Sequence, residues 1–157
     1  MVVNSPLSQR QNQVWSMLGS GLTVSEVASK LKKTFQYVNQ TKRTAEAKLS
    51  DALIRVGETS NLQIKRVLPK EGILWGFHPG LGLDTFVTYT SKHGMRVWYW
   101  YDDPEEVTDK RFLFETRNYL LNLAEERRIQ LDENEKQLHP ALLAKHIFSR
   151  LIPEASN

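Results

Sequence analysis

The stretch LTVSEVASKLKKTFQYVNQTKRTAEAKL, residues 22 to 49, decides the fold of the N-terminal part of the chain. Apolar residues recur in its first half at steps of three and four, the stripe of a short helix: Val24, Val27, Ala28 and Leu31. Thr23 precedes this helix as an N-cap, and Glu26 lies three residues further on, which completes a capping box. The polar turn Lys32 to Thr34 follows directly. Two short helices joined by so tight a turn predict a helix-turn-helix.

The second helix of the pair is longer. Thr34 is its expected N-cap, and its apolar residues follow steps of seven, four, three and four: Val38, Ala45, Leu49, Ala52 and Val56. This spacing predicts a helix over Phe35 to Val56 with a single buried face.

The opposite face of that helix carries polar side chains. At about 100° per residue, Gln36, Asn39, Gln40 and Arg43 project away from the buried stripe. Amide side chains can pair bidentately with adenine and arginine with guanine, while lysines at the flanks suit phosphates. A solvated helix face is the alternative interpretation. This face lies between basic residues in a two-helix unit, and the combination predicts that the protein binds double-stranded DNA. The predicted DNA contacts are Lys32, Lys33, Thr34, Gln36, Tyr37, Asn39, Gln40, Lys42 and Arg43.

A family resemblance covers residues 7 to 53, about a third of the chain. The residues that carry it are Leu7 to Gln11, Val14, Gly21 to Thr23, Glu26 to Ala28, Leu31 and Val38. They resemble the LuxR/GerE-type helix-turn-helix, which is itself similar to the fourth region of sigma factors. The long helix with Ala45, Leu49 and Ala52 resembles more closely the archaeal Tfx-type transcriptional regulators. The resemblance implies a helix-turn-helix fold, DNA binding and a role in transcription regulation.

Length and composition limit the number of domains and the class of protein. With 157 residues and 40% apolar composition, the chain can hold one medium domain or two small ones. It contains no cysteine, so we expect neither disulfides nor a thiolate zinc site. There is no signal peptide or membrane-spanning run, so a soluble cytoplasmic protein without membrane contact is expected. Residues 1 to 60 hold eight Lys/Arg and four Asp/Glu, which puts the basic excess on the helix-turn-helix segment.

Another helix precedes the motif. Val14, Met17 and Leu18 lie at helical spacing after Ser8, a candidate N-cap, and Gly19 or Gly21 ends the helix. Trp15 in this helix is interpreted as a core residue or a surface contact. The polar stretch Gly57 to Asn61 contains a glycine expected to end the long helix. It predicts a boundary between a DNA-binding domain, residues 1–60, and a second domain, residues 62–157.

The second domain is predicted to be α+β. Four runs rich in Val, Ile, Thr and aromatic residues predict strands within residues 62–68, 72–78, 84–90 and 95–101, joined by turns. Asp103 to Glu106 predicts the start of a helix reaching about Leu131, and Asp132 to His139 reads as a charged loop. Pro140 starts a last helix, ended by Pro153. The predicted fold is an N-terminal helix-turn-helix bundle followed by a four-stranded antiparallel sheet packed with two C-terminal helices.

No catalytic constellation is visible. The four histidines lack metal-ligand spacing, and Gly80 and Gly82 lack the third glycine, the lysine and the following helix of a phosphate loop. No nucleophile-elbow motif occurs. The sequence therefore predicts no catalytic residue, metal or cofactor, and a protein that is not an enzyme.

The strand around Arg96 to Tyr101 is apolar on both faces. Alternation puts Val97 and Tyr99 on one side and Trp98 and Trp100 on the other. The C-terminal helices can cover one face, and the other needs the DNA-binding unit, a second subunit or a ligand. Trp98 and Trp100 are thus core aromatics, dimer contacts or the wall of a small-molecule pocket.

Together these observations predict a homodimeric, sequence-specific DNA-binding transcriptional regulator whose C-terminal domain dimerises and can sense a small-molecule effector. The end of the long helix, at Ala52, Leu53 and Val56, is a second predicted dimer contact. The alternative is a small-molecule-binding or catalytic α+β module, built around the glycine loop and Trp98/Trp100, that the helical unit tethers to nucleic acid.

Overall fold

The computed structural model of the chain describes residues 5–100 and 110–155. Three helices come first: α1 (Gln9–Gly19), α2 (Val24–Leu31) and α3 (Phe35–Thr59). Four strands follow: β1 (Gln63–Leu68), β2 (Ile73–His78), β3 (Leu83–Thr90) and β4 (Gly94–Tyr99). They form one antiparallel sheet in the order β1-β2-β3-β4. The chain continues with α4 (Lys110–Glu126), α5 (Glu133–Lys136), α6 (Pro140–Leu151) and a short 3-10 helix, Pro153–Ala155. The predicted α+β class is confirmed.

The predicted helix caps are also confirmed. Ser8 and Thr23 each form a capping box, with Gln11 and Glu26 respectively, and the Thr34 hydroxyl accepts a hydrogen bond from the Tyr37 N–H at 3.0 Å. Each cap satisfies backbone N–H groups that the first helical turn leaves without partners. These local hydrogen bonds explain why α1, α2 and α3 begin where the sequence indicates.

The end of α3 differs from the prediction. The helix continues through Gly57 to Thr59, and Asn61, with φ of 61°, follows it. Gly57 is buried, and a Cβ there would lie 3.3 Å from a Leu74 methyl and 3.4 Å from an Ile64 methyl. The interpretation of Gly57 as the end of the helix was therefore wrong. The absent side chain instead lets α3 lie close against the sheet.

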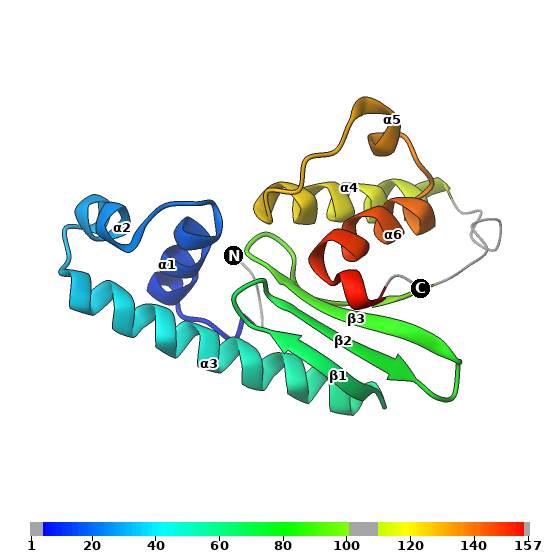
Figure 1. Ribbon diagram of the computed structural model, residues 1–157, viewed down its shortest axis with the longest axis horizontal. Coiled ribbons are helices and arrows are strands. Elements are labelled where there is room, and N and C mark those ends of the chain that lie inside the picture. The colour runs from blue at the N-terminus through cyan, green and yellow to red at the C-terminus, as the bar shows by residue number, and fades with distance from the viewer. Residues whose placement is uncertain (1–4, 101–109, 156–157) are drawn as a thin grey trace.

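One helix thus joins both parts of the chain. The first half of α3 packs with α1 and α2 away from the sheet, and its second half runs along the sheet (Figure 1). Two buried clusters make this contact. Leu53 packs with Leu62, Leu74 and Val87, and Val56 lies against the same cluster. Trp15, Ala45 and Leu49 pack with Leu7 and Tyr89. The sequence analysis did not decide what covers the second face of the sheet, and in the structure α3 covers it. Leu53 and Val56 therefore pack inside the molecule rather than forming a dimer contact.

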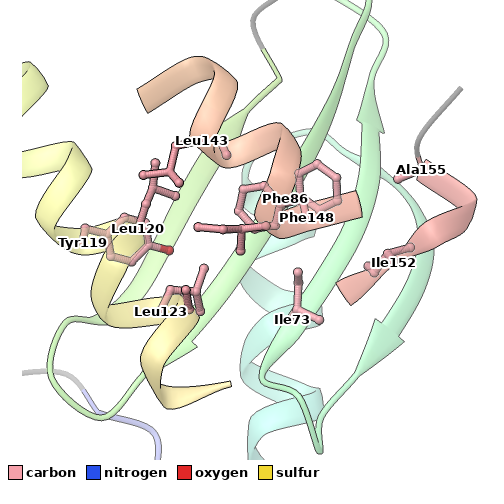
Figure 2. Packing of buried hydrophobic residues seen from close by; sticks show 12 residues of the cluster. Ile73, Phe86, Tyr119, Leu120, Leu123, Leu143, Phe148, Ile152 and Ala155 are labelled. Atoms are coloured by element: carbon pink, nitrogen blue, oxygen red, sulfur yellow. The ribbon is translucent and has the colours of Figure 1, made fainter. Parts of the chain in front are cut away.

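The other face of the sheet carries the largest cluster. Phe86 of β3 stacks on Phe148 of α6, with ring centroids 4.3 Å apart, and Figure 2 shows the aliphatic side chains around this pair. The cluster also includes Ile73, Tyr119, Leu120, Leu123, Leu143, Ile147 and Ile152. At roughly 1.5–3 kcal/mol for each fully buried large apolar side chain, this layer contributes much of the stabilisation. The predicted packing of the two C-terminal helices on the sheet is confirmed.

The C-terminal helices differ from the prediction in detail. Helix α4 ends at Glu126 rather than near Leu131, because Arg128 adopts φ of 57° and turns the chain. The predicted loop contains a single helical turn, α5, held by a capping box between Asp132 and Glu135. Tyr101 and the predicted helix start at Asp103 to Glu106 lie outside the described residues. Among the described helices, none has the length and apolar composition needed to cross a membrane.

Candidate nucleic-acid interface

The turn between α2 and α3 has helix-turn-helix geometry. Lys32 adopts φ of 55° at the end of α2, and the Lys33 N–H donates to the Ala28 carbonyl oxygen at 3.0 Å. This left-handed residue with its backward hydrogen bond closes the helix and redirects the chain within three residues. Below the turn, Val38 is fully buried against Val14, Val27 and Ala28. The first two turns of α3 are therefore fixed by a small three-helix core.

Most of the predicted contact residues share one exposed surface. Seven side chains along the turn and the first half of α3 are exposed: Lys32, Lys33, Thr34, Gln36, Tyr37, Gln40 and Arg43. Asn39 is half-buried beside them. We call this surface the reading face. In Figure 1, this part of α3 extends beyond the sheet, with α1 and α2 on one side of it only.

Lys42 lies apart from the reading face. It is half-buried and lines a cleft together with Trp15 and Arg127. The helical projection explains this position, because Lys42 is only about 40° from Val38 around the helix axis. The structure therefore separates Lys42 from the other predicted contacts.

Two aromatic side chains add apolar surface to the start of α3. The Phe35 side chain is 52% exposed and that of Tyr37 is 37% exposed, with Lys33 Nζ 5.2 Å from the Tyr37 ring centroid. Apolar groups at such positions can contact thymine methyl groups in the major groove. The sequence prediction did not include Phe35. Its position three residues before Val38 is compatible with the buried stripe, yet its side chain is exposed.

A polar hollow of about 380 Å³ flanks the reading face. Ser8, Arg10 and Gln11 of α1 line it on one side, and Tyr37, Gln40, Thr41 and Thr44 of α3 on the other. Gln11 Oε1 accepts hydrogen bonds from the Ser8 N–H at 2.9 Å and from Lys48 Nζ at 3.2 Å. The start of α1 thereby widens the polar surface, a contribution the sequence prediction did not assign.

Trp98 and Trp100 lie far from this surface in the fold, on β4 and just after it. Both are half-buried and pack against the cluster beneath α4 and α6, with Trp100 and Phe86 ring centroids 5.5 Å apart. Trp98 also lines a hollow of about 400 Å³ with His93, Arg96 and Tyr119. The two indoles thus contribute to the interior while Trp98 keeps one side in an open hollow.

Arg127, at the end of α4, fixes the helix-turn-helix to the rest of the molecule. Its Nε donates to the Glu71 carbonyl oxygen and its Nη2 to that of Tyr89. Its guanidinium carbon lies 4.6 Å from the Trp15 ring centroid, and Trp15 Nε1 donates to the Pro69 carbonyl oxygen at 3.1 Å. Burial lowers the pKa of Arg127. Neither Arg127 nor this junction was predicted, because its contacts join residues far apart in the sequence.

Comparisons of the chain with models of protein families, with curated proteins and with solved structures find no match. Within residues 5–100 and 110–155, no group of three or more His, Asp or Glu side chains is arranged to hold a metal ion. Function is therefore inferred from the geometry of the reading face.

Proposed function

We propose that the protein is a sequence-specific transcriptional regulator that binds double-stranded DNA by placing the first half of α3 in the major groove. One observation carries the proposal. The reading face is exposed on a helix whose opposite side is fixed in a three-helix core and which follows a three-residue turn. The major groove of B-DNA admits an α-helix, and helix-turn-helix proteins present the first turns of their second helix to the bases.

The side chains divide by chemistry. Gln36, Asn39 and Gln40 offer amides that match adenine, and Arg43 offers a guanidinium that matches guanine. The turn residues Lys32, Lys33 and Thr34 suit phosphate oxygens, which fix the position of the helix without reading sequence. Phe35 and Tyr37 supply apolar surface for thymine methyl groups. The excess of four basic residues in residues 1–60 adds the electrostatic attraction that such binding needs.

The proposal includes a homodimer. A single recognition helix reads only a few base pairs, and proteins of this type commonly pair so that two helices meet the groove about one turn apart. In the described part of the chain, β1 and β4 are the outer strands of the sheet, each paired on one side only. These edges lie in residues 62–157, the region in which we place the dimer contact.

Selection of binding sites from random duplexes with the purified full chain tests the proposal. We expect a recurrent motif of a few base pairs, and a wild-type affinity for it well above that for a scrambled duplex. Affinity should fall steeply with salt, as phosphate neutralisation requires. Recovery of no motif, or equal affinity for motif and scrambled duplex, would overturn sequence-specific binding.

A further inference from the structure

A cleft of about 690 Å³ lies between α1, α3 and the end of α4. Its volume is within the range of small-molecule sites, roughly 300–1,000 Å³. Its walls come from four parts of the chain that meet at the junction described above: Trp15 and Leu18 of α1, Lys42 and Glu46 of α3, Lys70 and Glu71 of the β1–β2 turn, and Glu125 with Arg127 to Gln130 at and after the end of α4. A second hollow of about 530 Å³ shares Trp15, Gly19, Glu125 and Arg127 with it.

Arg127 brings to this cleft a hydrogen-bond donor that has no partner among the described residues. Two of its donors are taken by backbone carbonyl groups, and among the described residues no carboxylate forms an ion pair with it. Within that same part of the chain, its Nη1 has no hydrogen-bond partner. Guanidinium carries five N–H donors, so Nη1 remains able to donate to a bound group. Burial lowers the pKa of Arg127 more than the carboxylates of Glu126 and Glu71 raise it. An anionic group in the cleft would accept a hydrogen bond from Nη1.

The surrounding charges limit what that anion can be. Lys42, Lys70 and Arg128 line the cleft, which favours negative charge, but Glu46, Glu71 and Glu125 line it as well. The acids disfavour an extended polyanion such as a nucleic-acid backbone. A compact ligand with one anionic group and a neutral or cationic remainder fits both sets of side chains.

We propose that the cleft binds a small molecule carrying one carboxylate or phosphate group, held by Arg127, and that its occupancy changes the affinity of the protein for DNA. The second part rests on the proposed function. The coupling follows from shared residues, because the Arg127 guanidinium lies on Trp15 of α1 and the cleft is lined by Lys42 of α3. A ligand that draws the guanidinium towards itself shifts the helices that carry the reading face relative to α4.

Titration of the ¹⁵N-labelled full chain tests the site, with the Trp15 Nε1–H and Arg127 Nε–H resonances as reporters. Inorganic phosphate, acetate and glycine, each up to about 20 mM, are the probes, a range that detects dissociation constants in the millimolar range. Saturable shifts of both resonances with phosphate, or with acetate and glycine, support the site and identify which anion it prefers. No saturable shift with any of the three would overturn it.

A matched pair of double variants separates this site from general charge attraction. Lys70→Ala with Arg128→Ala should weaken binding of the effective probe about tenfold. Arg55→Ala with Lys136→Ala removes the same charge outside the cleft, from an exposed and a half-buried position, and should leave binding unchanged. Equal weakening by both pairs would contradict the assignment.

DNA affinity measured with and without the effective probe tests the regulatory part separately. A change of several-fold in the wild type that is absent from the Lys70/Arg128 variant supports it. Probe binding with unchanged DNA affinity refutes regulation but leaves the site. Absence of DNA binding under all conditions would refute the proposed function, while the titration without DNA still decides whether the cleft takes an anion.

Discussion

Trp15 of α1 and Tyr89 of β3 pack edge to face, with ring centroids 5.2 Å apart. The Tyr89 hydroxyl donates to Asn12 Oδ1 at 2.8 Å and lies 3.0 Å from Ser5 Oγ. The helix-turn-helix and the sheet therefore share apolar and polar contacts in addition to α3. Units that share a core in this way are expected to unfold together.

We accordingly expect one cooperative unfolding transition, with circular dichroism and tryptophan fluorescence giving coincident curves in denaturant. Tyr89→Phe should lower the free energy of unfolding by roughly 1–3 kcal/mol, because it removes the partner of Asn12 while keeping the ring. Tyr37→Phe, at an exposed tyrosine, is the control and should stay within about 0.5 kcal/mol of wild type. Two separate transitions in the wild type would contradict the shared core.

Gly72 and Gly82 provide a second comparison, because both have positive φ, 64° and 67°. A Cβ at Gly72 would lie 2.7 Å from Arg127 Nη2 and 2.9 Å from both Trp15 Cζ2 and the Tyr89 carbonyl oxygen. A Cβ at Gly82 meets nothing within 4 Å. Gly82→Ala should therefore lower stability by about 1–2 kcal/mol, the strain of the left-handed conformation alone. Gly72→Ala should add a clash and lose about 3 kcal/mol or more. If denaturant titrations gave equal losses of unfolding free energy for the two variants, the residues around Gly72 would have to move aside at little cost, which would contradict this prediction.

Substitutions on the reading face should affect DNA binding in two different ways, according to whether the side chain contacts bases or phosphates. Gln40→Ala and Arg43→Ala should each reduce discrimination between the selected site and a scrambled duplex by roughly 1–3 kcal/mol. Lys33→Ala should weaken both duplexes alike and reduce the salt slope by about 1. Arg55→Ala, exposed on the half of α3 that runs along the sheet, is the control and should change neither. Fluorescence anisotropy at several salt concentrations measures all four, and unchanged discrimination in folded Gln40→Ala and Arg43→Ala proteins would exclude base reading by this face.

Stability should decrease at alkaline pH through Tyr119. Burial raises the pKa of Tyr119 from 10.0 to about 12, although its hydroxyl is hydrogen-bonded to Thr88. Below pH 10 the side chain is neutral in both states, so its contribution is fully present. Between pH 10 and 12 the unfolded chain loses this proton and the folded chain keeps it, which removes up to roughly 3 kcal/mol of stability. Tyr119→Phe should flatten the fall of stability with pH in this window, and an unchanged slope would refute the assignment.

Sedimentation of the full chain tests the homodimer. We expect a dimer at micromolar concentration, and a monomer across that range would contradict the proposal. The isolated segment 62–157 is unsuitable for this test. Without α3, the fully buried Leu74, Val87 and Tyr89 would lose their cover and cause association for an unrelated reason.

The sequence predicted features that depend on neighbours in the chain. Thr23, Thr34 and the alternation within the strands are local signals, and the corresponding caps and strands are present. Gly57 was misinterpreted because its meaning depends on Leu74, which lies 17 positions later in the sequence and against the same helix face. A glycine near the end of an apolar stripe looks the same whether it ends the helix or admits a neighbour.

In the candidate site, too, local features could be predicted from the sequence and long-range contacts could not. Gln36, Gln40 and Arg43 could be placed on an exposed face by helical projection alone. Lys42 could not, because the cleft that it lines is formed by α1 and the end of α4, and no local pattern predicts their meeting. Arg127 was missed for the same reason, since its partners Glu71, Tyr89 and Trp15 come from three separate elements.

Helix α3 runs without interruption from the reading face to the sheet. Its 25 residues span about 37 Å and contain no proline, so the half that carries the reading face and the half that lies on the sheet form one continuous helix. No proline is present to kink the helix between the reading face and the sheet. A tilt of about 5° at the sheet end, pivoting there, displaces the far end by about 3 Å over that length. Under the proposed function, a change at the sheet end of α3 therefore reaches the DNA-contacting end as a rotation of the whole helix, with a displacement that grows with distance from the sheet.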